Sequence, residues 1–262
     1  MREQRVVAII QARMSSSRLP GKVLRDIHGK PMLVWVVERA RRAQCLTEVM
    51  VATTTDPADD MIEQVCRQLG IACFRGNGFD VLDRYYQAAR EAEADVIVRI
   101  TADCPLIDPG LIDVVVERFF EKKVDFAANR LPPPYQRTYP IGLDVEVVSF
   151  TALQRAWQQA TEKHEREHVL PYLYEIPGRF NILTVDYERD LGSYRWTVDT
   201  YQDLQFVQQV FALLPDRESF TWLDVLKIVQ DNPHLNEINA GITHKTFKDV
   251  DARAQKDKKD NA

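Results

Sequence analysis

The sequence predicts an α/β protein with a mostly parallel central sheet flanked by helices. Two observations lead to this prediction. Strand-like and helix-like patterns alternate along the first 130 residues, as they do in chains of βαβ units. The strand-like segments are also apolar at successive positions, for example in Val96-Ile97-Val98, which is typical of strands buried on both faces.

The first half of the chain is expected to hold strands at 6–12, 48–55, 72–75, 95–102 and 125–129, with helices at 31–44, 59–69, 80–93 and 109–121. Pro31 and Pro109 fit the first turn of a helix. Asp56 followed by Pro57 is typical of a helix cap with an early proline. The helix starts therefore agree with the βαβ pattern.

The pattern changes after residue 130. The segment 130–140 contains four prolines with aromatic and basic residues, which suits a substrate-covering loop better than a plain linker. Residues 143–150 begin with an alternating pattern that places Asp144 and Glu146 on one face. The further elements expected are a helix at 151–174 broken near Pro171, a strand pair at 180–187 and 194–198, and helices at 201–214 and 222–230.

The composition indicates a soluble protein of a reducing compartment. The chain has 262 residues, 45% hydrophobic residues and a net charge of -5, so we expect neither a nucleic-acid nor a membrane partner. Its four cysteines form no CxxC pair. No signal peptide or membrane span is predicted, which favours the cytoplasm. The charged tail at 245–262 is expected to be flexible, and residues 1–244 to form one domain.

A basic cluster follows the first predicted strand. Arg13, Arg18 and Lys22 lie within ten positions, with small residues and no acid between them. One interpretation is a solvated basic loop. The position favours anion binding instead, because ligands of open parallel sheets lie at the carboxyl ends of the strands. In an acidic chain, a small anion is a better ligand for this cluster than a polyanion.

Two aspartates follow apolar stretches in the same way. Asp103 comes after the fourth predicted strand, and Asp199 ends the stretch from Arg195. Each could cap the following helix. Together, beside a cationic phosphate loop, they could also hold Mg²⁺, which commonly takes one or two carboxylates and completes its shell with phosphate oxygens and water.

These segments carry a family resemblance. Residues 11–24, Gln-Ala-Arg-Met-Ser-Ser-Ser-Arg-Leu-Pro-Gly-Lys-Val-Leu, resemble the nucleotide-binding signature of the CMP-sugar synthetases, which include the CMP-Kdo and CMP-sialate synthetases. Residues 101–107 resemble that group's Gly-Asp-Glu-Pro-Leu segment, and residues 196–204 its Val-Asp-Thr-Pro-Glu-Asp-Leu segment. The SpsF-like proteins of spore-coat polysaccharide biosynthesis are more similar still, because 142–147 and 165–169 also match.

The resemblance spans residues 6–240 in the same order. It implies a Rossmann-like, GT-A-like nucleotidyltransferase fold with a nucleotide-binding half at 1–130 and an acceptor and metal half at 131–244. It implies a homodimer that transfers CMP from CTP to a sugar or related acidic acceptor, including an amino sugar, with Mg²⁺ as the metal. Pyrophosphate would leave, and the product would serve cell-surface polysaccharide biosynthesis.

The same resemblance assigns roles by position. Arg13, Lys22, Asp103 and Asp199 would be catalytic, and the two aspartates would hold Mg²⁺. The residues expected at the nucleotide are Ala12, Arg13, Ser17, Arg18, Lys22, Thr53, Thr54 and Thr101. The chain departs from the pattern at Cys104, where CMP-Kdo synthetases carry an acid, at Thr101, which replaces a glutamine, and at Tyr201-Gln202, which replace Pro-Glu.

The acceptor is expected to meet residues of the second half together with one from a predicted helix of the first. Arg130 could grip a carboxylate or phosphate. Asp144 and Glu146 could bind sugar hydroxyls or an amine, although Glu146 could equally lie on a solvent face. The complete set is Arg84, Arg130, Tyr139, Asp144, Glu146, Glu165 and His168.

Three alternatives remain open at this level. Residues 164–168 match the HExxH pattern of zinc proteases, but the surrounding charges favour a solvated helix. A nucleotide-sugar-dependent glycosyltransferase would share the layered α/β architecture, although its usual Asp-x-Asp motif is not found at Asp103 or Asp199. A non-catalytic nucleotide-binding protein would have less need of Lys22, Asp103 and Asp199 together.

Overall fold

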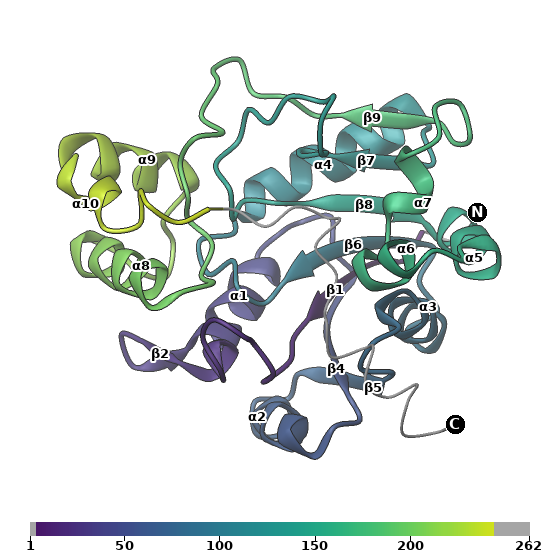
Figure 1. Ribbon diagram of the computed structural model, residues 1–262, viewed down its shortest axis with the longest axis horizontal. Coiled ribbons are helices and arrows are strands. Elements are labelled where there is room, and N and C mark those ends of the chain that lie inside the picture. Colours follow the sequence, from purple (N-terminus) through teal and green to yellow (C-terminus); the bar gives the residue numbers. More distant parts are fainter. Residues whose placement is uncertain (1–3, 244–262) are drawn as a thin grey trace.

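The computed structural model describes residues 4–243 and is centred on a seven-stranded sheet. The strand order is β5-β4-β1-β6-β8-β7-β9 (Figure 1). The strands are β1 (Val6–Gln11), β4 (Glu48–Thr54), β5 (Ala72–Gly76), β6 (Val96–Thr101), β7 (Phe126–Ala128), β8 (Glu146–Ser149) and β9 (Ile182–Thr184). Only β8 runs antiparallel to its neighbours in this sheet. The predicted mostly parallel α/β fold is therefore confirmed.

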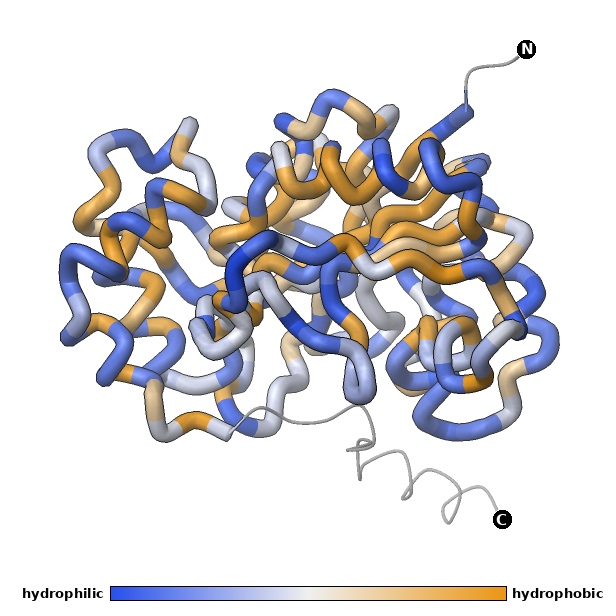
Figure 2. Tube along the Cα trace, turned by 90° about the horizontal axis from the view of Figure 1, so that it is seen from above, coloured by the Kyte–Doolittle hydropathy of each residue, from blue (hydrophilic) through white to orange (hydrophobic). Residues whose placement is uncertain are grey.

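Helices cover both faces of the sheet because the buried strands are apolar on both faces. In β1, Ala8 and Ile10 belong to one core cluster, whereas Val7 and Ile9 belong to the other. Figure 2 shows the hydrophobic segments gathered along these strands. The first cluster includes residues of α1 (Met32–Ala40), α2 (Asp60–Gln68), α4 (Pro109–Lys122), α8 (Tyr201–Leu213) and α9 (Trp222–Asp231). The second includes residues of α3 (Val81–Glu91), α5 (Phe150–Gln159) and α7 (Pro171–Tyr174).

Shorter elements complete the described chain. A small hairpin of β2 (Asp26–Ile27) and β3 (Lys30–Pro31) follows the turn η1 (Lys22–Leu24). The turn η2 (Pro57–Asp59) precedes α2. The remaining helices are α6 (Lys163–His168) and α10 (His234–Glu237). In Figure 1, α8, α9 and α10 lie together at the left, on the opposite side of the view from α3, α5 and α6.

Side-chain caps explain several helix starts. Asp80 accepts a hydrogen bond from Asp83 N at the start of α3, and Asp108 accepts one from Leu111 N at the start of α4. Ser149 caps α5 in the same way. Each cap satisfies a backbone N–H that has no partner inside the helix, so the sequence fixes where these helices begin.

One prediction in the second half is wrong, and another is only partly right, since its break near Pro171 does occur, between α6 and α7. The predicted pair at 180–187 and 194–198 does not form: β9 pairs in parallel with β7, and Arg195 makes only an isolated bridge to Ile141. The backbone of residues 194–198 makes its hydrogen bonds with two other segments, because Trp196 N donates to Ile141 O and Val198 N donates to Asp103 O. The predicted helix at 151–174 is divided into α5, α6 and α7. The tail at 245–262 lies outside the described residues.

The strand order changes direction between β1 and β6, and this switch point is called the crevice below. From β1 the sheet extends through β4 to β5 on one side, and through β6 on the other. Both strands point the same way. Such a reversal of strand order is where doubly wound sheets bind ligands, at the carboxyl ends of the strands. The loop after β1 and residues 101–103 at the end of β6 meet at this point.

Candidate functional site

The loop after β1 is held in place by backbone bonds. Met14 O accepts hydrogen bonds from Ser16 N and Gly21 N, and Met14 N donates to Asp59 Oδ1 at 2.7 Å. Gly21 has a φ of 69°, in the left-handed region that glycine adopts without strain. The loop therefore turns back tightly and delivers Lys22 to the crevice.

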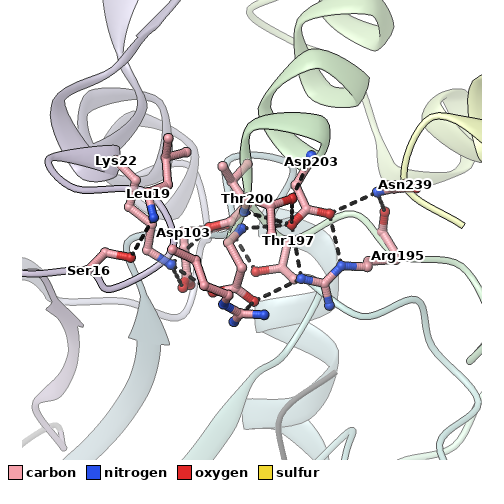
Figure 3. Close-up of polar contacts among 12 residues, drawn as sticks. Ser16, Leu19, Lys22, Asp103, Arg195, Thr197, Thr200, Asp203 and Asn239 are labelled. Carbon is pink, nitrogen blue, oxygen red and sulfur yellow. Dashed lines mark hydrogen bonds and ion pairs between the residues drawn. The ribbon is translucent and has the colours of Figure 1, made fainter. Parts of the chain in front are cut away.

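Lys22 is the centre of the site. Its Nζ donates to Asp103 Oδ2 at 2.6 Å, to Asp199 Oδ1 at 2.9 Å and to Val198 O at 2.9 Å. Figure 3 shows Lys22 directed at Asp103 from the neighbouring loop. Burial alone would lower the pKa of Lys22, but the two carboxylates outweigh it and raise the pKa. The ammonium group therefore stays charged and joins two segments that are far apart in sequence.

Asp199 has three cationic partners. Besides Lys22, its Oδ2 lies 2.9 Å from Arg18 Nη2 and 2.9 Å from Arg195 Nη2. Burial would raise the pKa of Asp199, but Lys22, followed by Arg18 and Arg195, lowers it well below its usual range. This carboxylate is therefore ionised at every physiological pH.

Asp203 holds the backbone of Asp199 and the side chain of Arg195 in place. Its fully buried carboxylate accepts from Arg195 Nε at 2.9 Å and from the backbone N–H groups of Asp199 and Thr200. Asn239 Nδ2 donates to it at 3.1 Å (Figure 3). Thr200 and Asp203 also form the capping box of α8. The start of this helix thus fixes the orientation of both Asp199 and Arg195.

Asp103 is oriented by its own turn. Thr101 Oγ1 donates to Asp103 Oδ1 at 2.6 Å, which leaves Oδ2 to Lys22. The neighbouring Cys104 is buried, and its burial, then the charge of Asp103, raises the pKa of the thiol well above its usual value. A neutral, buried thiol therefore lies directly beside the carboxylate of Asp103.

The other predicted nucleotide residues surround the same loop. Ala12 is buried beside Ala52, Ser17 is exposed, and Thr53 is fully buried on β4. Thr54 donates its hydroxyl to Asp59, which also holds Met14 N. Asp59 thus ties the end of β4 to the start of the loop.

A second charged group lies on β6 and β8. Arg99 pairs with Glu146 across the two strands, and its Nη2 donates to Gln11 Oε1 at 3.0 Å. Glu146 is buried, so the alternative of a solvent-facing Glu146 is wrong. Burial lowers the pKa of Arg99, but the charge of Glu146 outweighs it and raises the pKa.

Arg130 and His168 lie beside this pair. Arg130 Nε is 3.4 Å from Asp144 Oδ2, and Arg137 Nη1 is 2.5 Å from Asp144 Oδ1. Burial, followed by the charges of Arg99 and Arg130, lowers the pKa of His168 to about 4. Its imidazole is therefore neutral near pH 7.

Two buried nitrogen atoms in this group, Arg99 Nε and His168 Nε2, have no hydrogen-bond partner within residues 4–243, and Arg130 Nε has only the ion-pair contact with Asp144. Buried donors without partners are costly. Their gathering among mutually interacting charges indicates a place for an anionic or polar ligand group.

The backbone after α6 is strained where it presents His168. Val169 has a φ of 74° and a ψ of -56°, and Leu170 N donates to His168 O at 3.0 Å. This is the rare γ-turn with positive φ, which is unfavourable for a β-branched residue. Such strain is typical of positions where a side chain must be held for function.

Other predicted acceptor residues have structural partners. Glu165 accepts from Thr161 N and Glu162 N at the start of α6. Arg84 is buried and donates to Asn77 O at 2.5 Å, and burial lowers its pKa to about 10. The ring of Tyr139 packs against Tyr187 and Trp222, so Tyr139 is not brought to the group around Arg99.

The zinc-protease alternative is not supported. His164 Nε2 contacts Glu175 at 2.9 Å, whereas His168 faces Arg99 and Arg130. In the part of the chain that the structure describes, no group of three or more His, Cys, Asp or Glu side chains could hold a metal ion. A surface pocket lined by Asp95, Phe120 and Ser149 lies at the opposite end of β6 from Asp103.

The oxygen atoms around Lys22 fit a divalent cation. Two carboxylates and the Val198 carbonyl oxygen already surround a positive charge, and Mg²⁺ prefers oxygen ligands. Asp103 and Asp199 are the residues that would hold the metal. The ammonium group of Lys22 is the stand-in ion that shows this fit.

Sequence reasoning missed four residues of the site. They are Arg99, Arg137, Arg195 and Asp203. A signal existed for Arg99, because a charged residue inside the apolar run 96–101 needs a buried partner. Asp203 follows Thr200 at the spacing of a capping box. Nothing in the sequence pairs Arg137 with Asp144 or Arg195 with Asp199.

Comparisons with known proteins identify the family of this chain. A family model described as cytidylyltransferase matches residues 7–237. The spore coat polysaccharide biosynthesis protein SpsF of Bacillus subtilis is 30% identical over 235 residues, which cover 87% of this chain and 95% of that protein.

Solved structures show the same fold. A cytidylyltransferase from Leptospira borgpetersenii superposes with a TM-score of 0.85 at 32% identity, covering 92% of this chain and 100% of that chain. A CMP:2-keto-3-deoxy-manno-octonic acid synthetase complexed with CTP gives a TM-score of 0.62 at 24% identity, covering 80% and 99%. Because the family model matches residues 7–237, this chain belongs to the cytidylyltransferase family.

Proposed function

We propose that this protein transfers CMP from CTP to a sugar or related acidic acceptor and releases pyrophosphate, with Mg²⁺ as the metal. The observation that supports this most directly is the meeting of Lys22 with Asp103 and Asp199 at the crevice between β1 and β6. Cations for a triphosphate and carboxylates for a metal occupy one place. The similar synthetase solved with CTP supports the choice of nucleotide.

In the proposed reaction, an acceptor oxygen attacks the α-phosphorus of CTP, and any proton on that oxygen passes to water. The new oxygen–phosphorus bond forms as the bond to the β-phosphate oxygen breaks, and pyrophosphate leaves with its electron pair. Arg13, Arg18 and Lys22 neutralise the charge of the triphosphate, and Mg²⁺ when bound would supply Lewis-acid stabilisation of the same charge. No covalent enzyme intermediate is needed.

The acceptor is proposed to bind at Arg130, Asp144, Glu146 and His168, together with Arg99. The nitrogen atoms of Arg99 and His168 that lack a hydrogen bond, with the charge of Arg130 beside them, support an acidic group on the acceptor. The carboxylates of Asp144 and Glu146 are already paired with Arg137 and Arg99. They would bind hydroxyl or amine groups of the acceptor once an acidic group of the acceptor takes over part of the contacts of these arginines. The proposal therefore includes acidic sugars and amino sugars.

The proposed setting is cell-surface polysaccharide biosynthesis in the cytoplasm, with the protein as a homodimer. The similarity to SpsF supports the pathway. The four cysteines are free thiols, which is usual in reducing compartments. Among residues 4–243, no helix is long and apolar enough to cross a membrane.

A pyrophosphate-release screen tests the proposal. Each of four nucleoside triphosphates is combined with a panel of acidic sugars, amino sugars and phosphonates in the presence of Mg²⁺. We expect release with CTP and an acidic or amino-sugar acceptor, and none after removal of the metal with a chelator. Glycosyl transfer from an intact nucleotide sugar, or CTP binding without turnover on any acceptor, would contradict it.

A further inference from the structure

We infer that Lys22 is a built-in counter-ion, whose ammonium group occupies the place of the divalent cation until the nucleotide draws it away. This inference rests on the proposed function, because it takes Asp103 and Asp199 as the metal ligands. It adds a coupling between two binding events, so that the metal binds weakly to the nucleotide-free protein and tightly once the nucleotide is present.

The contacts of Lys22 are the first support. All three N–H groups of the ammonium have an oxygen acceptor, at 2.6 Å on Asp103, 2.9 Å on Asp199 and 2.9 Å on Val198. The side chain is only 11% exposed. A metal ion that used the same oxygen atoms would lie within a few ångströms of a like charge, so it cannot enter while the ammonium group remains.

The second support is that the carboxylates keep their positions without Lys22. Asp199 remains bonded to Arg195, whose guanidinium is anchored on the fully buried Asp203. Asp103 remains bonded to Thr101 Oγ1. Departure of Lys22 therefore leaves two oriented carboxylates with less counter-charge, as a cation site requires.

The third support is the position of Lys22 and Arg18 on the anion-binding loop itself. Arg18 is the other loop cation on Asp199, and its side chain is 28% exposed. Phosphate oxygens compete with carboxylates for both groups, since lysine and arginine bind either anion. A triphosphate thus removes two cations from the carboxylates, and the metal replaces them.

Reciprocity follows from this exchange. If the nucleotide increases the affinity for the metal by removing Lys22, the metal increases the affinity for the nucleotide by the same factor. The exchange also keeps the nucleotide-free site neutralised, because unpaired carboxylates and cations are costly in a partly buried crevice.

The test measures Mn²⁺ binding to the full, nucleotide-free chain from the electron paramagnetic resonance signal of free Mn²⁺. Lys22→Met removes the ammonium group, and Lys22→Gln keeps a polar group there without the charge. Both variants are expected to bind Mn²⁺ at least about tenfold more tightly than the unsubstituted protein. Adding Asp103→Asn to either variant is expected to abolish this gain.

Lys30→Met is the matched control, because Lys30 also bridges two acids, Glu38 and Glu218, away from the crevice. It is expected to leave Mn²⁺ binding unchanged. Circular dichroism verifies that each variant is folded. Equal Mn²⁺ affinity of the unsubstituted protein and the folded Lys22→Gln variant would overturn the inference.

This outcome is separable from the fate of the proposed function. The Mn²⁺ measurement contains no nucleotide or acceptor, so it reports only on the two carboxylates and Lys22. A gain in Mn²⁺ affinity together with a negative pyrophosphate screen would reject the proposed reaction and retain the inference. Pyrophosphate release without any gain in Mn²⁺ affinity would retain the proposed reaction and reject the inference about Lys22.

Discussion

Single charged residues determine what this crevice can bind. Lys22 has two carboxylates as partners, and Asp199 has three cations. In isolation, each aspartate could equally have been a helix cap. In the structure Thr200 and Asp108 cap the following helices, and the two aspartates converge on one ammonium group instead.

The first prediction concerns these carboxylates. Asp103→Asn and Asp199→Asn are each expected to lower kcat for metal-dependent pyrophosphate release by about 10²-fold or more, because each removes a charge that stabilises the metal and the triphosphate. The exposed Asp231→Asn, which disrupts only a surface pair with Lys227, is the control. Near-normal turnover in both site variants would contradict the assignment.

The second prediction concerns His168 and pH. Its pKa is about 4 in the folded protein, first because of burial and then because of Arg99, and about 6.5 in an unfolded chain. Between these values the unfolded chain binds more protons, so this contribution to the free energy of unfolding is lost as the pH falls from about 6.5 to 4.

His168→Gln removes this titration. Chemical denaturation at pH 7.5 and 4.5 is expected to show that acidification lowers the free energy of unfolding of the variant by about 2–3 kcal/mol less than that of the unsubstituted protein. Other titrating groups are common to both chains. An identical loss of stability in the two proteins would show that His168 is not held neutral by its surroundings.

At the scale of elements, the start of α8 is the part of the site that is built into the fold. Its capping box uses the same Asp203 that anchors Arg195, and Arg195 contacts Asp199. The start of α8, the buried ion pair of Arg195 with Asp203 and the carboxylate of Asp199 are therefore one unit. The third prediction tests this unit.

Asp203→Asn is expected to lower the free energy of unfolding by about 3–5 kcal/mol, because it leaves a buried guanidinium without its main partner. The control is Asp224→Asn in the capping box of α9, which is exposed and is expected to cost less than about 1 kcal/mol. Urea denaturation measures both variants. Equal losses would show that Asp203 is only a helix cap.

Elements were predictable from sequence where local signals were strong. The apolar runs of β1, β4 and β6 and the capped starts of α3 and α4 lie within the predicted ranges. The site residues on the turns after β1 and β6 followed from the same reasoning, because strand ends in parallel sheets meet. The short β7 and β9, of three residues each, have too few positions for a pattern to fix their pairing.

At the scale of the whole molecule, the antiparallel β8 joins the two halves of the chain. It lies between β6 and β7 and brings Glu146 to Arg99. This pairing was not predictable, since no local pattern states which strand a segment will join. The acceptor group therefore depends on topology, whereas the nucleotide loop depends on local sequence.

The fold brings the basic loop after β1, the carboxylates of Asp103 and Asp199 and the buried pair of Arg99 and Glu146 together along β1 and β6. The loop comes from the first half of the chain, and Asp199 and Glu146 come from the second. Transfer between a nucleotide and an acceptor requires both at once. The central claim is thus that the acceptor itself becomes covalently joined to CMP.

The most direct measurement is mass spectrometry of the products formed from CTP, Mg²⁺ and an acceptor that supports pyrophosphate release in the screen. The account predicts one CMP–acceptor conjugate for each pyrophosphate released, and neither product with the Asp103→Asn variant. Release of pyrophosphate without a CMP–acceptor conjugate, or equal conjugate formation by Asp103→Asn, would contradict it.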